Sequence, residues 1–187
     1  MSPATHFLSG WVFANCFDLD RRDRALITWA AVVPDVDGLG VIAEVATRNT
    51  SHPLMWFSEY HHLLHNLWFA IFCMLAALAF ARRKWLTSTM VLAAFHLHLL
   101  GDIVGARGPE GYGWPIPYLW PVNKTVSLSW SGEWPLNSWQ NMLITLALLG
   151  ISIWIIRRKG RSPVEPISLA ADRAVVDALR RRMQIAA

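Results

Sequence analysis

The chain has 187 residues, of which 54% are hydrophobic and only 16% are charged, with a formal net charge of +4 and 11 tryptophans. A soluble domain normally carries about 25% charged residues, so this composition excludes an ordinary water-soluble globule and a disordered chain. Tryptophan is enriched where membrane proteins meet the lipid headgroups, and the length suits a single domain. We therefore expect a membrane protein.

The first segment of interest covers residues 6–19, which are apolar but too few to cross a bilayer as a straight helix, since a span needs about 20 residues. We expect this segment to be half-buried or re-entrant. Cys16 and Cys73 lie in apolar surroundings, which is typical of buried cysteines rather than of a disulfide or a zinc site.

Four stretches are apolar enough to enter a membrane, at residues 25–46, 63–81, 85–104 and 139–156. The first is interrupted at residues 34–38 by Pro-Asp-Val-Asp-Gly, a break that lipid tolerates only where the backbone lines a cavity. The third contains His96, His98 and Asp102, and such groups usually face a bundle interior. We predict an all-α, polytopic helix bundle with about four membrane segments and a broken helix at the Pro-Asp-Val-Asp motif.

Two further regions complete the predicted organisation. Residues 105–138 are rich in Gly, Pro and Trp, which is typical of an irregular cap at the extracytoplasmic interface. Residues 161–187 are basic, and a short amphipathic helix is expected after Ser168. We therefore divide the chain into a membrane-embedded domain at residues 1–160 and a cytoplasmic tail at residues 161–187.

Basic residues flank the apolar stretches instead of forming one patch. The clusters are Arg21, Arg22 and Arg24; Arg82, Arg83 and Lys84; Arg157, Arg158, Lys159 and Arg161; and Arg180, Arg181 and Arg182. The positive-inside rule places such clusters in the cytoplasm, so we expect a multi-pass protein of the inner (cytoplasmic) membrane and no nucleic-acid partner. The same rule puts His6, His61 and Asp102 on the extracytoplasmic side.

Histidines and acidic residues gather on that side in patterns typical of a metal site. His98 and Asp102 are four residues apart, as are His61 and His65, so each pair shares one face of a helix. Two carboxylates separated by one residue face one cavity if their backbone is extended. Imidazole and carboxylate bind Zn²⁺, Mn²⁺ and Fe²⁺, and we expect one or more divalent ions, with zinc as the first choice. The expected ligands are His6, Asp35, Asp37, His61, His65, His98 and Asp102.

Each group also has a purely structural explanation. His6 suits a helix start at the interface, Asp35 and Asp37 suit a turn, and His98 with Asp102 suits a buried hydrogen-bonded pair. A metal ion accounts for all of them together, because burying several unpaired ionisable groups is costly and one cation can stabilise several at once.

The same motifs carry a family resemblance. Thr5-His6, Pro34-Asp35-Val36-Asp37, the Tyr-His-His-Leu-Leu-His-Asn run at residues 60–66, the His98 to Asp102 spacing, and Tyr-Leu-Trp-Pro at residues 118–121 lie in the order found in the family. Over about residues 5–121 the chain resembles the YdjM-like family of membrane-bound, predicted metal-dependent hydrolases. His62 stands where the family usually has arginine, and the following histidine is one residue closer, so either His61 or His62 is the ligand.

The resemblance implies hydrolysis by a metal-activated water. A more remote similarity to the zinc-dependent phospholipase C group implies a phosphoester substrate, such as a phospholipid or a lipid-linked phosphate. Asp37 is then expected to act as the general base, and His62 to protonate the leaving group or to orient a ligand. The alternatives are a metal-binding or metal-transporting membrane protein without enzymatic activity, and a scaffold with a purely structural metal site.

Overall fold

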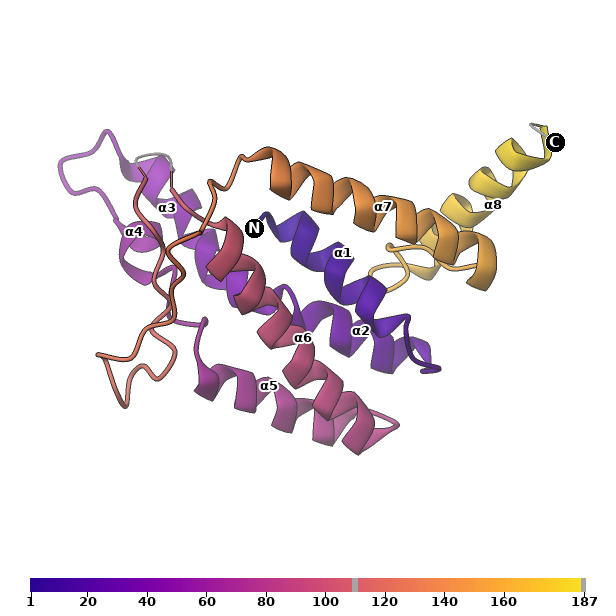
Figure 1. The fold of residues 1–187 in the computed structure, drawn as a ribbon, viewed down its shortest axis with the longest axis horizontal. Helices are drawn as coiled ribbons and strands as arrows, with labels where there is room; N and C mark the ends of the chain where they lie inside the picture. The colour runs from indigo at the N-terminus through magenta and orange to yellow at the C-terminus, as the bar shows by residue number, and fades with distance from the viewer. Residues whose placement is uncertain (109–110, 186–187) are drawn as a thin grey trace.

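The computed structural model describes residues 1–108 and 111–185 (Figure 1). Over these residues the chain forms eight α-helices and one 3-10 segment, with no strands. Only two isolated backbone bridges, between Arg107 and Pro135 and between Ile116 and Leu128, resemble sheet pairing in the part described. The predicted all-α class is confirmed.

Five helices form the bundle: α1 (Pro3–Ala14), α2 (Arg21–Ala30), α5 (Leu67–Phe80), α6 (Lys84–Gly105) and α7 (Trp139–Lys159). Helix α6 lies in the middle and packs against α5, α2 and α1, while α7 packs against α1 (Figure 1). Buried Val91, Phe95 and Leu99 of α6 contribute to two apolar clusters of the core. The polar side chains on the same inner face of α6 are therefore held inside the bundle.

Local capping sets where several helices begin and end. Asp20 accepts a hydrogen bond from the Asp23 amide at 2.9 Å and starts α2, while Asn66 accepts one from the Phe69 amide at 3.0 Å and starts α5. Helix α7 ends at Gly160, whose φ of 62° lies in the left-handed region that glycine adopts without strain. Because of its Asn66 cap, α5 is shorter than the apolar stretch that contains it.

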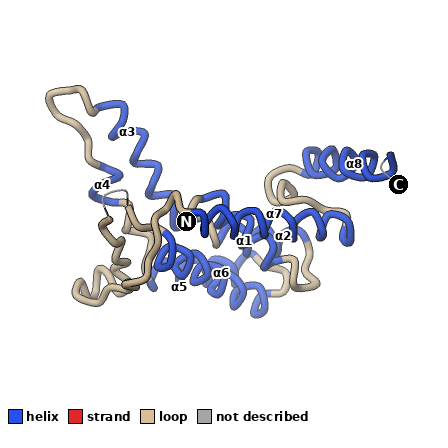
Figure 2. Tube along the Cα trace, turned by 45° about the horizontal axis from the view of Figure 1, so that its top comes forward, coloured by secondary structure: helices blue, strands red, loops and turns tan. Residues whose placement is uncertain are grey.

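The chain changes direction directly after α2. The 3-10 segment η1 (Val33–Leu39) begins next to Pro34 and leads into α3 (Gly40–Thr47), and the axis from η1 through α3 is bent by 53° from that of α2. Helices α3 and α4 (Trp56–Tyr60) form an arm that projects from the bundle (Figure 2). Residues 34–38 thus form a 3-10 turn rather than the extended backbone considered from the sequence, since Pro34 favours the first turn of a helix.

Two of the described helices, α6 and α7, are long and apolar enough to cross a membrane. The bent pair of α2 with Val33–Thr47 qualifies as a third span if it is counted as one. Helix α5 is apolar but has only 14 residues, because the chain before Asn66 forms turns instead of helix. The prediction of about four membrane segments therefore corresponds to two or three candidate spans plus this shorter helix.

Beside the end of α6, the described part of the cap region, residues 106–108 and 111–138, contains no regular helix. The Asn141 side-chain amide donates to the carbonyl of Gly105 at 2.8 Å and to that of Leu136 at 2.8 Å, and the Trp134 indole donates to Asn141 Oδ1 at 2.9 Å. A single polar side chain at the start of α7 therefore fixes both ends of the cap against α6.

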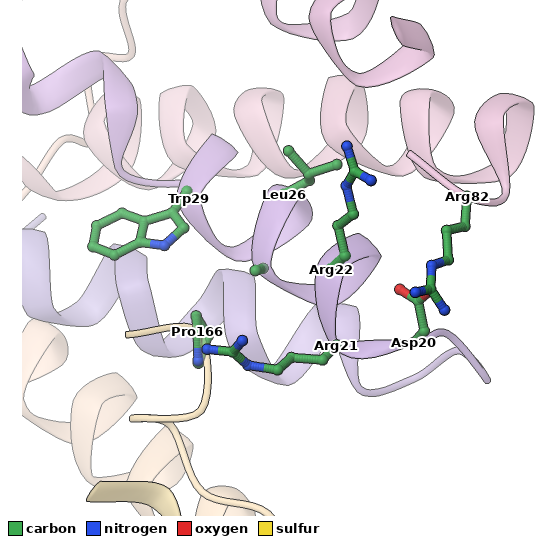
Figure 3. A pocket seen from close by; sticks show the side chains of 8 residues that line it. Asp20, Arg21, Arg22, Leu26, Trp29, Arg82 and Pro166 are labelled. Atoms are coloured by element: carbon green, nitrogen blue, oxygen red, sulfur yellow. The ribbon is translucent and has the colours of Figure 1, made fainter. Parts of the chain in front are cut away.

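Two of the basic clusters meet where α6 begins. Arg21, Arg22 and Arg82 line a cavity of about 710 Å³ together with Trp29 (Figure 3). Asp20 forms an ion pair with the Arg82 guanidinium, with 3.0 Å between Arg82 Nε and Asp20 Oδ2, which leaves an excess of positive charge on the cavity wall. This is the end of the bundle that the charge pattern assigns to the cytoplasm.

The segment after α7 is tied to the bundle by buried charges. Arg24 of α2 forms a two-pronged ion pair with Glu165, and both side chains are buried. The backbone amide and hydroxyl of Ser162 donate to Asp172 at 2.6 and 2.7 Å. These contacts hold the start of α8 (Leu169–Ile185), the helix found within the predicted tail.

Candidate metal centre

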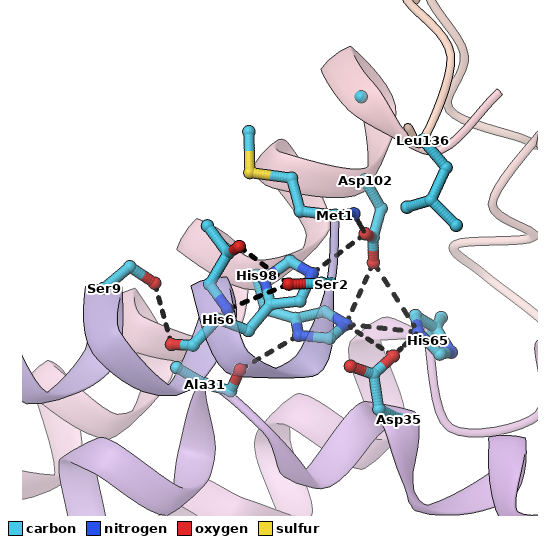
Figure 4. A network of polar contacts seen from close by, with 12 residues as sticks. Met1, Ser2, His6, Ser9, Ala31, Asp35, His65, His98, Asp102 and Leu136 are labelled. Carbon is cyan, nitrogen blue, oxygen red and sulfur yellow. Dashed lines mark hydrogen bonds and ion pairs between the residues drawn. The ribbon is translucent and has the colours of Figure 1, made fainter. Parts of the chain in front are cut away.

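Four side chains from three parts of the chain converge on one point (Figure 4). Asp35 comes from η1, His65 from the turn before α5, and His98 and Asp102 from one face of α6. One nitrogen or oxygen atom of each residue lies within 4.8 Å of the corresponding atoms of the other three. All except Asp35 are buried, so these ionisable groups face one another instead of water.

The distances within this cluster suit a small divalent cation. His98 Nε2 lies 3.2 Å from His65 Nε2 and 3.0 Å from Asp102 Oδ2, while Asp35 Oδ1 lies 3.7 Å from both imidazole nitrogens. Ligands of a tetrahedral zinc ion, bound at about 2.0–2.2 Å, lie roughly 3.4 Å from one another. The observed spacings bracket that value.

Hydrogen bonding also leaves acceptors facing the centre. The carbonyl of Ala31 lies 3.0 Å from His98 Nδ1 and can only accept, so Nδ1 carries the proton. In neutral His98 the lone pair of Nε2 then points at Asp102 Oδ2, which is buried and accepts no well-formed hydrogen bond. Asp35 Oδ2 is likewise buried without a partner. A cation is the group that satisfies such a set of lone pairs.

Asp37 contacts the histidines on the side turned away from the centre. Its Oδ1 accepts a hydrogen bond from His61 Nδ1 at 2.8 Å, and its Oδ2 accepts one from the Leu64 amide at 3.0 Å and lies 3.6 Å from His65 Nδ1. A carboxylate on the outer nitrogen of a histidine directs the other nitrogen toward a metal. Because a 3-10 turn has three residues, Asp35 and Asp37 point in different directions, one into the centre and one toward the histidines.

His6 reaches the centre from α1. Its Nε2 lies 3.0 Å from Asp102 Oδ1, and its ring lies 3.9 Å from the His98 ring between centroids. The amino group of Met1 pairs with the same Asp102 oxygen. His6 therefore contacts a member of the four-residue cluster and orients its carboxylate, leaving Oδ2 turned to the two imidazoles.

His61 lies beside the cluster between two aromatic rings. Its ring stacks at 4.6 Å from Phe57 and at 5.1 Å from Trp114, with 21° between the planes in each case. A side chain at Gly38 would place its Cβ only 2.9 Å from His61 Cε1, so the ring fits where it does because this residue is glycine. His61 Nδ1 is held by Asp37, which leaves Nε2 as the free proton acceptor of the ring.

A cavity of about 400 Å³ opens onto this group of residues. Its walls include Asp35 and Asp102 of the cluster, His61 and His62 beside it, and Trp114 from the cap. The cavity thus combines a few convergent polar groups with aromatic walls, the usual composition of a small-molecule site.

The carboxylates also change the protonation of His65, which precedes α5. Burial by itself lowers the pKa of His65, but the neighbouring Asp35, Asp37 and Asp102 outweigh burial and raise the pKa to about 9. Without a metal ion, His65 therefore carries a proton at neutral pH. A cation that enters the centre must displace this proton.

The residues expected from the sequence fall into three groups in the structure. Asp35, His65, His98 and Asp102 form the cluster; His6 and Asp37 contact it; His61 and His62 line the adjoining cavity. The expectation that His61 and His65 share a helix face is wrong, because residues 61–66 form turns and the helix starts only after the Asn66 cap. His96 lies apart and bonds to Tyr118 at 2.8 Å.

Two contributors to the site were not expected. The carbonyl of Ala31 orients His98, and a backbone atom leaves no signal in the sequence. Trp114 contacts both His61 and His65, with its ring 4.8 Å from that of His65. The sequence places Trp114 in the cap but gives no indication of which cap tryptophan folds over the histidines.

Comparison with curated proteins and with solved structures gave no match. The sequence model of one family, described as YdjM inner membrane protein, matches residues 1–176, a range that includes every residue of the candidate centre. This agrees with the apolar helices of the bundle and with the resemblance seen in the sequence motifs. The chain therefore belongs to the YdjM inner membrane protein family.

Proposed function

We propose that this protein is an integral membrane metal-dependent hydrolase that acts on a phosphoester, such as a phospholipid or a lipid-linked phosphate. The observation that carries the proposal is the cluster of Asp35, His65, His98 and Asp102 on the wall of an aromatic cavity. Buried imidazole and carboxylate ligands next to an open cavity favour a catalytic site over a closed structural one.

In this proposal the four cluster residues hold a divalent ion, with zinc as the first choice and manganese or iron as alternatives. The bound ion supplies Lewis acidity, which makes water easier to deprotonate and offsets negative charge on a phosphoryl oxygen. The donor set of two imidazoles and two carboxylates has no thiolate and suits all three metals.

In this proposal, neighbouring residues accept and donate the protons of the reaction. The oxygen of water attacks phosphorus, its proton passes to Nε2 of His61, and the ester bond between phosphorus and the leaving oxygen breaks. Asp37 stabilises the resulting imidazolium through its contact with His61 Nδ1, so the two residues act together as the general base. His62, on the cavity wall, donates a proton to the leaving alcohol.

The charge pattern supports an extracytoplasmic location for the centre. Asp102 lies near the end of α6, whereas Arg82 and Lys84 lie where that helix begins. If the basic end faces the cytoplasm, then the cavity opens at the outer side of the inner membrane. The substrate would then be a lipid, or a phosphate attached to a lipid, in the outer half of that membrane.

The test measures metal content and hydrolysis in the same preparations. Asp102→Asn and His98→Ala are expected to lose bound zinc and the hydrolysis of a phospholipid and phosphodiester panel together. Matched controls are Asp177→Asn on the exposed face of α8 and His52→Ala in the exposed loop of the α3–α4 arm, which should retain both. Metal binding without hydrolysis of any substrate would replace this proposal with a metal-binding or metal-transporting role.

A further inference from the structure

A further cavity, of about 420 Å³, lies between α1, α6 and α7. Most of its wall is hydrocarbon, contributed by each of the three helices. Val12 and Phe13 come from α1, Leu97 and Leu100 from α6, and Ile144 and Leu148 from α7. We call this cavity the α1–α7 groove.

The polar groups on the wall of the groove are already used within the protein. Ser9 donates its hydroxyl to the carbonyl of His6 at 2.8 Å, Thr5 bonds to the Thr145 hydroxyl at 2.8 Å, and the Cys16 thiol lies 3.5 Å from the carbonyl of Val12. An occupant of the groove is therefore offered apolar contacts rather than hydrogen bonds along these walls. This suits an alkyl chain and does not suit a sugar, a peptide backbone or water.

The groove adjoins the candidate metal centre. Met1 lines both this groove and the cavity beside the cluster, and Gly101 of the groove precedes Asp102 of the cluster. His6, on the groove wall, contacts Asp102 at 3.0 Å. Met1 and His6 therefore separate the groove from the centre, and a molecule with its polar part at the centre and its apolar part in the groove lies against these two residues.

The length of the groove matches one leaflet of a bilayer. Its wall follows α1 from Thr5 and continues to Cys16, just past the end of that helix, and a helix rises about 1.5 Å per residue, so the groove is roughly 16 Å long. The hydrocarbon core of a membrane is about 30 Å thick, and one leaflet contributes about half of it. The α1–α7 groove thus runs for the depth of one acyl chain.

We propose that the α1–α7 groove binds an acyl chain of the substrate while the phosphoester lies at the metal centre. This inference rests on the proposed hydrolase function and names its substrate class as an acylated lipid phosphoester. Most of the binding energy then comes from apolar contacts remote from the reacting bond, which hold that bond in place at the centre.

The first test fills the groove. Leu148→Trp adds bulk on the wall of the groove, and Leu149→Trp adds the same bulk one residue later at an exposed position outside it. Both variants are assayed with a phospholipid and with bis(p-nitrophenyl) phosphate, which has no acyl chain. The ratio of lipid to soluble-ester turnover is expected to fall about tenfold or more in Leu148→Trp and to stay unchanged in Leu149→Trp. Equal losses on both substrates in Leu148→Trp would overturn the proposal.

The second test does not depend on turnover. A phospholipid with a photoreactive diazirine at its acyl terminus is irradiated with the purified protein in nanodiscs, and the labelled peptides are identified by mass spectrometry. Labelling at Val12 to Cys16 is expected in the unaltered protein and in Leu149→Trp, and loss of that labelling is expected in Leu148→Trp. Labelling of this segment that is the same in all three proteins would mean that only bulk lipid contacts it, and the groove proposal would fail. Groove labelling without any hydrolysis would instead contradict the hydrolase function alone.

Discussion

His65 and His98 face each other with their Nε2 atoms 3.2 Å apart, although they come from different segments of the chain. The Ala31 carbonyl fixes the proton of neutral His98 on the far side of its ring, so a lone pair points toward His65 and Asp102. A proton or a metal cation must lie among these atoms for the arrangement to be stable. Two carboxylates beside the imidazoles favour the divalent cation, because it offsets both negative charges.

Asp37→Asn is expected to weaken metal binding without abolishing it. Asp37 contacts His61 and lies behind His65, so its amide replacement loosens the orientation of both rings while leaving the four cluster residues intact. Changes to such supporting groups typically reduce metal affinity or activity by about 10–100-fold. Competition with a chromophoric zinc chelator measures the affinity. A loss no larger than that of His52→Ala would show that Asp37 does not support the centre.

Metal affinity is expected to rise with pH. The pKa of His65 is raised to about 9, above the ordinary 6.5 of histidine. In the metal-free protein the favourable contribution of this proton to folding is therefore complete below pH 6.5 and is lost as the pH rises through about 9. Zinc competes with that proton, so its affinity should increase by up to about tenfold per pH unit between pH 7 and 9. Titration calorimetry in two buffers of different ionisation enthalpy counts the released protons, and an affinity that does not vary over this range would contradict the assignment.

Arg24→Ala is expected to lower the stability of the fold by about 3–5 kcal/mol, because it leaves the buried carboxylate of Glu165 without its partner. Arg22→Ala, an exposed arginine on the same helix, is the matched control and should change stability by less than about 0.5 kcal/mol. Thermal unfolding in detergent, followed by tryptophan fluorescence, gives the comparison. Equal effects of the two variants would mean that the ion pair with Glu165 does not hold the segment after α7.

The side of the membrane on which the cap lies can be measured directly. Tyr112 is exposed in the cap, and Arg173 is exposed on α8. With the native cysteines replaced by serine, Tyr112→Cys is expected to react in intact cells with a maleimide that cannot cross the inner membrane, and Arg173→Cys only after lysis. The reverse pattern would invert the proposed topology and place the metal centre on the cytoplasmic side.

Much of the helical framework follows from local sequence signals. The His98 to Asp102 spacing placed two cluster residues on one helix face, and Pro34 with Gly38 marked the change of direction after α2. These features depend on backbone geometry within a few residues, which is why a sequence pattern can predict them.

The parts that sequence did not predict depend on contacts between distant segments. The start of α5 is set by the Asn66 side chain, which a hydropathy pattern treats as helix interior. Because α5 begins only after Asn66, His61 and His65 lie in turns and their rings point in different directions. His65 therefore belongs to the four-residue cluster, whereas His61 does not. The position of Trp114 depends on how the whole cap folds back over the bundle, a long-range property with no local signal.

The zinc content of the purified protein after equilibrium dialysis, measured by inductively coupled plasma mass spectrometry, tests directly whether the cluster of Asp35, His65, His98 and Asp102 binds a metal ion. The unaltered protein and His96→Ala, whose histidine bonds to Tyr118 outside the cluster, are expected to retain about one or more ions per chain, whereas His65→Ala and Asp35→Asn should retain almost none. Zinc contents that are the same in all four proteins would show that the cluster does not bind the ion.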